Sequence, residues 1–180
     1  MKKVSILVST IDSGGAEKQA VLLAIQLSKH TDVNLIVLNG GHTEYKGNVD
    51  LLAESSVKVH RLNGSMLLKT IRIRELLKES HTDVLLNYLT MPDFLGSFLG
   101  KRLRISVYNG IRNSRLPKSK MLMEKWAHNH WATATIYNCY SGADYFEKLG
   151  FRKDKNIVIP NCFSTRTYCR TFEHLEVIQL

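Results

Sequence analysis

The feature that most constrains the fold is a junction near the N-terminus, where an apolar segment meets two glycines and then a helix-forming segment. Residues 3–8 are short, apolar and rich in β-branched side chains, which is typical of a parallel strand buried on both faces. Residues 16–29 carry Ala, Leu, Gln and Lys with apolar residues at helical spacing, which predicts a helix. Gly14 and Gly15 lie between the two segments. Strand-glycine-helix junctions of this kind occur throughout doubly wound α/β folds.

The same junction is a candidate phosphate site. The first backbone N–H groups of a helix lack intrahelical partners, and glycine has no Cβ to keep an anionic group away. The positive end of the helix dipole also favours an anion. We therefore treat Gly14, Gly15 and Ala16 as candidate phosphate-binding residues. Glycines at such a turn can instead serve tight packing of the helix on the sheet, and this alternative stays open.

The rest of the chain alternates between strand-like and helix-like segments. A loop is expected from Gly40 through the polar run to Asn48. Strands are expected at 33–38, 57–62, 83–87, 104–108, 135–137 and 156–159, and helices at 66–79, 94–99, 121–131 and 142–149. This alternation predicts an α/β fold with a doubly wound, mostly parallel, Rossmann-like sheet that binds ligands at the carboxyl ends of its strands.

Charge and composition limit the classes of partner that this chain could bind. The 180 residues suit a single α/β domain, and the net charge of +9 favours anionic partners such as nucleic acid, lipid headgroups or phosphorylated substrates. The basic runs lack interleaved aromatic residues and nucleic-acid-binding motifs, so we expect no nucleic acid partner. Anionic lipid and phosphorylated substrates remain, and a solvated basic surface is the alternative to both.

Metal, disulfide and nuclease chemistry are not indicated. The cysteines are Cys139, Cys162 and Cys169, an odd number without a Cys-x-x-Cys pair, so we predict neither a zinc site nor a disulfide framework. His128 and His130 flank an asparagine in a nuclease-like triplet, but helical spacing would point them in different directions. We also expect no signal peptide and no membrane helix, which predicts a cytoplasmic chain.

Several segments taken together resemble the N-terminal, acceptor-side domain of family 4 glycosyltransferases. The similar stretches, which follow the family's order and spacing, are residues 13–18, 109–114, 138–143, 148–151 and 155–161. The resemblance covers roughly residues 2–163 and implies one half of a GT-B fold, in which two Rossmann-like domains face each other. The N-terminal domain is therefore expected at residues 1–163.

The resemblance also implies an activity. The complete enzyme would transfer a hexose from a nucleotide sugar to a saccharide or lipid-linked acceptor in surface polysaccharide synthesis, with retention of configuration and without a metal or another cofactor. It would act in the cytoplasm, in peripheral contact with the anionic inner face of the plasma membrane. The implied donor-phosphate residues are Gly14, Gly15, Ala16 and Arg112, and the implied acceptor residues are Thr10, Asp12, Thr90, Asn109 and Asn113. No catalytic residue is assigned.

Two departures from the family pattern qualify this interpretation. Cys162 stands where the family has glycine, and beyond Phe163 the resemblance stops, so residues 164–180 are expected to be a tail outside the family and the nucleotide-binding domain to be absent. The chain would then be truncated and inactive alone. The cleft turn that often carries a histidine in the family offers Asn109 and Arg112 instead.

Two other classes of protein are alternatives. The chain could be a non-catalytic interaction subunit of a split glycosyltransferase whose catalytic partner is a separate protein. A nicotinamide-dependent oxidoreductase is disfavoured, because the glycine loop is not Gly-x-Gly-x-x-Gly and Asn39 and Gly40, not an acidic residue, follow the second strand.

Overall fold

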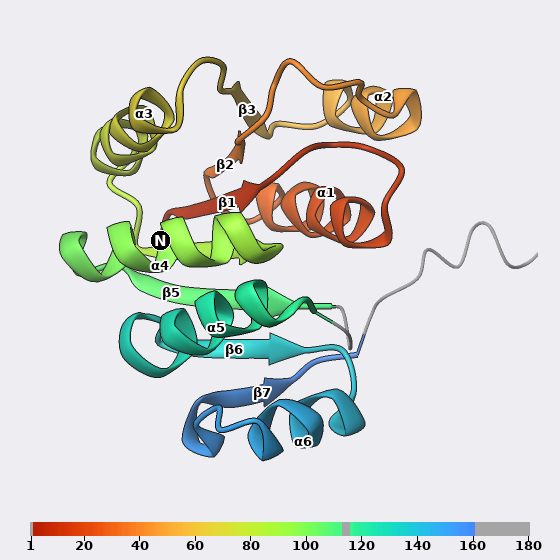
Figure 1. The fold of residues 1–180 in the computed structure, drawn as a ribbon. Coiled ribbons are helices and arrows are strands. Elements are labelled where there is room, and N and C mark those ends of the chain that lie inside the picture. The colour runs from red at the N-terminus through yellow and green to blue at the C-terminus, as the bar shows by residue number, and fades with distance from the viewer. Residues whose placement is uncertain (1, 113–115, 161–180) are drawn as a thin grey trace, which may run out of the picture.

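The computed structural model describes residues 2–112 and 116–160, and in this part of the chain seven parallel strands form one sheet (Figure 1). The strand order is β3-β2-β1-β4-β5-β6-β7. The strands are β1 Val4–Val8, β2 Val33–Val37, β3 Lys58–Arg61, β4 Val84–Tyr88, β5 Ser106–Ile111, β6 Ala134–Tyr137 and β7 Asn156–Val158. The predicted doubly wound α/β sheet is confirmed, and the third strand lies at the sheet edge.

Helices connect the strands and cover both faces of the sheet. The α-helices are α1 Gly15–Ser28, α2 Lys46–Ala53, α3 Met66–Glu79, α4 Thr90–Leu103, α5 Lys118–Trp126 and α6 Tyr140–Lys148. A π-helical turn, η1 Ala127–Trp131, continues α5, and a 3-10 turn, η2 Lys153–Lys155, precedes β7. Residues 113–115 and 161–180, which include Asn113 and the expected tail, lie outside the described residues.

The core consists of apolar layers on opposite faces of the sheet. Because side chains alternate along a strand, Ile6 and Val8 of β1 pack with α1, whereas Leu7 packs with α3 and α4. All five residues of β1 are buried, as expected for a central parallel strand. The glycines of α4 allow a close approach to the sheet, because a Cβ at Gly100 would collide with Val107 of β5.

Several expected boundaries were wrong, most clearly at β5, α2 and α4. Strand β5 runs to Ile111, although its end was expected at residue 108, so Asn109 lies in the strand and not in a turn. Helix α2 begins at Lys46, so the loop after β2 is shorter than the polar run suggested. This helix was missed because Gly47 and Asn48 in its first turn are residues that favour turns. Helix α4 begins at Thr90 and includes Pro92, although a shorter helix starting after the proline was expected. Proline is tolerated there because the N–H groups of the first helical turn have no intrahelical acceptor.

Candidate functional site

The candidate site lies where the strand order reverses, between β1 and β4. Val8, the last residue of β1, pairs in register with Tyr88 of β4, and Tyr88 pairs with Gly110 of β5. The carboxyl ends of these three strands therefore lie side by side. In open α/β sheets, ligands bind at this kind of topological switch point. Each of these strands is followed by a different predicted site segment: the glycine junction follows β1, Thr90 follows β4 and Arg112 follows β5.

The glycine junction presents an accessible helix N-terminus. Helix α1 begins at Gly15, and Gly14 caps it with an extended backbone but without a side-chain hydrogen bond. Gly15 is exposed, and an added Cβ would meet no described heavy atom within 4 Å. At Gly14 the added Cβ would meet the carboxylate of Glu17, not the sheet. Tight packing on the sheet therefore does not explain either glycine.

The side chains around this junction form a small hydrogen-bonded group. Thr10 donates its hydroxyl to the Glu17 carboxylate over 3.4 Å, so the carboxylate is held over the glycine turn. Asp12 is exposed and accepts a hydrogen bond from the backbone N–H of Ser13 at 2.7 Å. The buried Asn48 of α2 donates to the backbone carbonyl of Asp12 at 2.8 Å. The missed helix α2 thus fixes the loop that carries two predicted acceptor residues.

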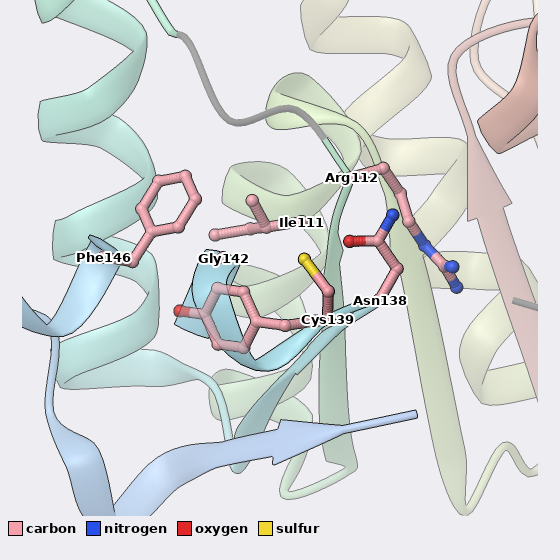
Figure 2. Close-up of a pocket in the computed structure, with 7 residues that line it drawn as sticks. Ile111, Arg112, Asn138, Cys139, Gly142 and Phe146 are labelled. Atoms are coloured by element: carbon pink, nitrogen blue, oxygen red, sulfur yellow. The ribbon is translucent and has the colours of Figure 1, made fainter. Parts of the chain in front are cut away.

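Arg112 reaches the switch point from β5. Its guanidinium carbon lies 5.4 Å from the centre of the Tyr88 ring. In Figure 2 the Arg112 side chain points away from Cys139 and Phe146. Because Tyr88 is in register with the last residue of β1, the guanidinium lies on the side of β5 that faces the glycine junction. Arg112 and the glycine junction therefore follow strands that end at the same edge of the sheet.

Two predicted acceptor residues have buried side chains. Thr90 begins α4 and is 9% exposed, with its hydroxyl directed at Glu124. Asn109 is 1% exposed, and its side-chain oxygen accepts hydrogen bonds from Asn87 at 2.9 Å and Ser97 at 3.0 Å. The alternation of β5 turns Asn109 toward α4, so as placed it stabilises the interior and does not line the cleft.

The sequence reasoning missed a buried pair of acids behind Arg112. Asp93 of α4 is fully buried and Glu124 of α5 is 2% exposed, and their carboxyl groups face each other. Burial and the neighbouring Glu124 raise the pKa of Asp93 well above its usual value. Burial likewise raises the pKa of Glu124 to about 7. An acidic residue inside an apolar helical segment is the one sequence signal that could have drawn attention to Asp93.

Comparison with known proteins identifies the family. Residues 13–167 match Glycosyltransferase Family 4. The chain belongs to this family. A 100-residue stretch is 34% identical to a Campylobacter jejuni protein named GalNAc-α-(1→4)-GalNAc-α-(1→3)-diNAcBac-PP-undecaprenol α-1,4-N-acetyl-D-galactosaminyltransferase, covering 49% of this chain and 26% of that protein.

Solved structures share the fold of the family 4 domain. Anabaena Alr3699/HepE in complex with UDP-glucose superposes with a TM-score of 0.77 at 16% identity, covering 93% of this chain and 46% of that one. The lipopolysaccharide outer core galactosyltransferase WaaB superposes with a TM-score of 0.66 at 13% identity, covering 90% and 46%. The chain thus spans about half the length of these GT-B structures, and the expected GT-B half-fold is confirmed.

A hollow on the surface of the family 4 domain lies beside the start of α6. It has a volume of about 170 Å³, and its lining includes Ile111, Cys139 and Phe146 (Figure 2). Cys139 is exposed and free, and hydrogen bonds from the Ser141 hydroxyl and the Gly142 backbone lower the pKa of its thiol. Among residues 2–112 and 116–160, no cluster of His, Cys, Asp and Glu could hold a metal ion.

The histidine triplet of the family 4 domain has a structural role. His128 is fully buried, with Nδ1 2.8 Å from the Thr135 hydroxyl and Nε2 3.0 Å from the backbone carbonyl of Arg152. Burial lowers the pKa of His128 to about 4, so the ring is neutral at pH 7. His130 is exposed and lies against Trp126. The expected divergence of the two histidines is confirmed.

Proposed function

We propose that this chain is the acceptor-side half of a retaining glycosyltransferase that moves a hexose from a nucleotide sugar to a saccharide or lipid-linked acceptor in surface polysaccharide synthesis. A second Rossmann-like domain would hold the base and ribose of the donor across the cleft, so residues 1–163 alone would be inactive. The half-length coverage of the GT-B structures supports this division. The name of the Campylobacter jejuni relative, with its undecaprenol-linked acceptor, supports a lipid-linked substrate.

The observation that carries the proposal is the exposed N-terminus of α1 at the carboxyl edge of the sheet. The glycine turn leaves backbone N–H groups accessible, and Arg112 approaches the same switch point from β5. Departure of a nucleoside diphosphate builds negative charge on its β-phosphate. Amides of Gly14, Gly15 and Ala16 and the guanidinium of Arg112 would stabilise this charge more in the transition state than in the ground state, which accelerates transfer.

The acceptor would approach past Thr10 and Asp12. Both follow β1 directly, and their loop is held by Asn48. The Asp12 carboxylate is exposed, and carboxylates accept hydrogen bonds from sugar hydroxyls. Thr90 and Asn109 are not part of this proposed acceptor surface, because their side chains are buried.

Helix α3 supports peripheral contact with an anionic membrane. Its first half exposes four apolar side chains, namely Met66, Leu67, Leu68 and Ile71. Arg72, Arg74 and Lys78 are exposed further along the same helix, although Arg72 is paired with Glu75 and Glu79. An amphipathic helix with basic flanks binds at the lipid headgroup boundary. In the described part of the chain, no helix is long and apolar enough to cross a membrane.

Inorganic pyrophosphate is the probe that tests the donor-phosphate site. A titration of the ¹⁵N-labelled chain should shift the backbone amide signals of Gly14, Gly15 and Ala16 together with the Nε–H signal of Arg112. Sulfate at equal ionic strength controls for non-specific screening. Shifts restricted to other basic segments, or identical shifts with sulfate, would exclude this site for the donor diphosphate.

A further inference from the structure

The buried acids Asp93 and Glu124 lie next to Arg112, one of the proposed donor-phosphate residues. Helices α4 and α5 pack against each other and bring the two carboxyl groups together. The pair and Arg112 line one small hollow of about 20 Å³, together with Thr90, Gly110 and Leu116 among others. Such a volume is enough for about one water molecule. The acids are therefore shielded from bulk solvent but adjacent to the cleft.

The hydrogen-bonding state of the pair requires a proton. Among described residues, neither oxygen of Asp93 nor Oε2 of Glu124 has a hydrogen-bond donor. Two ionised carboxylates cannot donate to each other, and burying both as anions is strongly unfavourable. If one carboxyl is protonated, it donates to the other, and the facing arrangement becomes a hydrogen bond. A single proton thus satisfies a contact that is otherwise repulsive.

Within residues 2–112 and 116–160, the positive charge that acts on the pair comes from Arg112. On α4 the Thr90 hydroxyl faces Glu124, and on β5 the backbone of Gly110 favours the anionic form of Asp93. On β6 the buried Tyr137 feels the negative charge of both acids, and its hydroxyl has no hydrogen-bond partner among described residues. Arg112, which follows β5, is the positive charge that acts on Asp93.

We propose that Asp93 and Glu124 share one proton, and that the single negative charge left on the pair positions Arg112 for the phosphate of the donor. The two acids are positioning residues, since they act through Arg112 and do not touch the ligand. The inference about the ligand rests on the proposed function, whereas the shared proton and its effect on Arg112 do not.

The arrangement couples anion binding to protonation. A phosphate bound beside Arg112 interacts with the same guanidinium that stabilises the negative charge of the pair. The ionised carboxyl then loses part of its electrostatic stabilisation, its pKa rises, and it takes up a proton from the buffer. Near neutral pH, binding of pyrophosphate is therefore accompanied by proton uptake at the acid pair, which offsets any proton that pyrophosphate itself releases.

The first experiment follows the pair without a ligand. Carboxyl ¹³C signals of Asp93 and Glu124 in the full chain should titrate in two separated, shared steps, the second near neutral pH. The Nε–H signal of Arg112 should shift with the second step. In Glu124→Gln, which keeps the shape of the side chain, the shared titration and the corresponding shift of Arg112 should disappear. Two independent titrations at ordinary carboxyl pKa values would overturn the proposal. An Arg112 signal that does not shift with the second step would also overturn it.

The second experiment measures proton uptake. Calorimetric titration with pyrophosphate at pH 7, in buffers of different ionisation enthalpy, should show more proton uptake in the wild type than in Asp93→Asn or Glu124→Gln. The comparison cancels the protons that pyrophosphate itself exchanges. Equal proton exchange in the wild type and both variants would overturn the coupling. If pyrophosphate does not bind at all, the proposed phosphate site fails, while the ligand-free titration still decides whether the pair shares a proton and positions Arg112.

Discussion

Arg112 covers the end of the neighbouring strand, with its guanidinium carbon 5.4 Å from the centre of the Tyr88 ring. Tyr88 pairs in register with Val8, the last residue of β1. A side chain that leaves β5 is therefore held over β4, next to the strand that leads into the glycine turn. This relationship joins sequence segments about a hundred residues apart into one candidate anion site.

Replacing Gly15 tests the helix N-terminus. Gly15→Asp places a carboxylate where the proposed phosphate binds, so pyrophosphate affinity should fall at least about tenfold through like-charge repulsion. Gly15→Ala is the matched control, because an added Cβ meets no described atom within 4 Å. The alanine variant should retain affinity within about twofold, a difference of less than 0.5 kcal/mol. Equal affinities of the aspartate and alanine variants, measured by calorimetry, would contradict the assignment.

Replacing Arg112 tests the second contact. Arg112→Gln removes the positive charge but keeps a hydrogen-bonding side chain, and a lost charged hydrogen bond predicts a decrease of about 10- to 100-fold in pyrophosphate affinity. Lys101 at the end of α4 is also basic and exposed, so Lys101→Gln is a charge-matched control. If the two variants weaken binding equally, general electrostatics and not a specific contact would explain the affinity.

Glu124 should make stability fall as the pH rises. Burial raises its folded-state pKa to about 7, above the unfolded value, so its contribution is present at low pH and lost as the pH passes through neutrality. Relative to Glu124→Gln, the wild type should lose on the order of 2 kcal/mol of unfolding free energy between pH 5 and pH 8. Urea denaturation of both proteins across this range measures the difference, and parallel curves would argue against a buried, protonated acid.

His128 should have the opposite effect. Burial lowers its folded-state pKa to about 4 from 6.5, so the unfolded chain binds the proton more readily and stability falls as the pH drops between these values. The wild type should lose up to about 3 kcal/mol over this interval. His128→Gln, which cannot take up a proton, should show a smaller decrease in urea denaturation. The exposed His130 provides the control, because His130→Gln should reproduce the wild-type slope.

The apolar start of α3 can be tested with vesicles. Leu67 is 71% exposed, and Leu67→Glu should reduce sedimentation of the chain with vesicles that contain anionic lipid, since it places a charge in the proposed contact. Leu122 of α5 is 68% exposed, so Leu122→Glu is a matched control that should bind normally. High salt should release the wild type from anionic vesicles. Equal binding to neutral vesicles, or equal loss in both variants, would count against a membrane-facing α3.

The local sequence pattern was sufficient to predict much of the fold. Buried apolar runs located the strands, and helical periodicity located α1 and α3 within one residue at each end. Helix α2 was missed because glycine and asparagine in its first turn favour turns. The start of α4 was misplaced because Pro92 was expected to precede the helix, although proline is tolerated in a first helical turn. The glycine junction was predicted as well, since a strand, two glycines and a helix suffice to define an exposed helix N-terminus.

The sequence by itself therefore determined the α/β class, the parallel sheet and the candidate phosphate turn, because each follows from residues that are near neighbours in the chain. Only the tertiary structure decided which distant side chains meet. It buried Thr90 and Asn109, which looked like cleft residues, and it brought Asp93 of α4 against Glu124 of α5. Burial and pairing depend on how helices pack across a sheet, and no local spacing encodes the distance between two side chains on different helices.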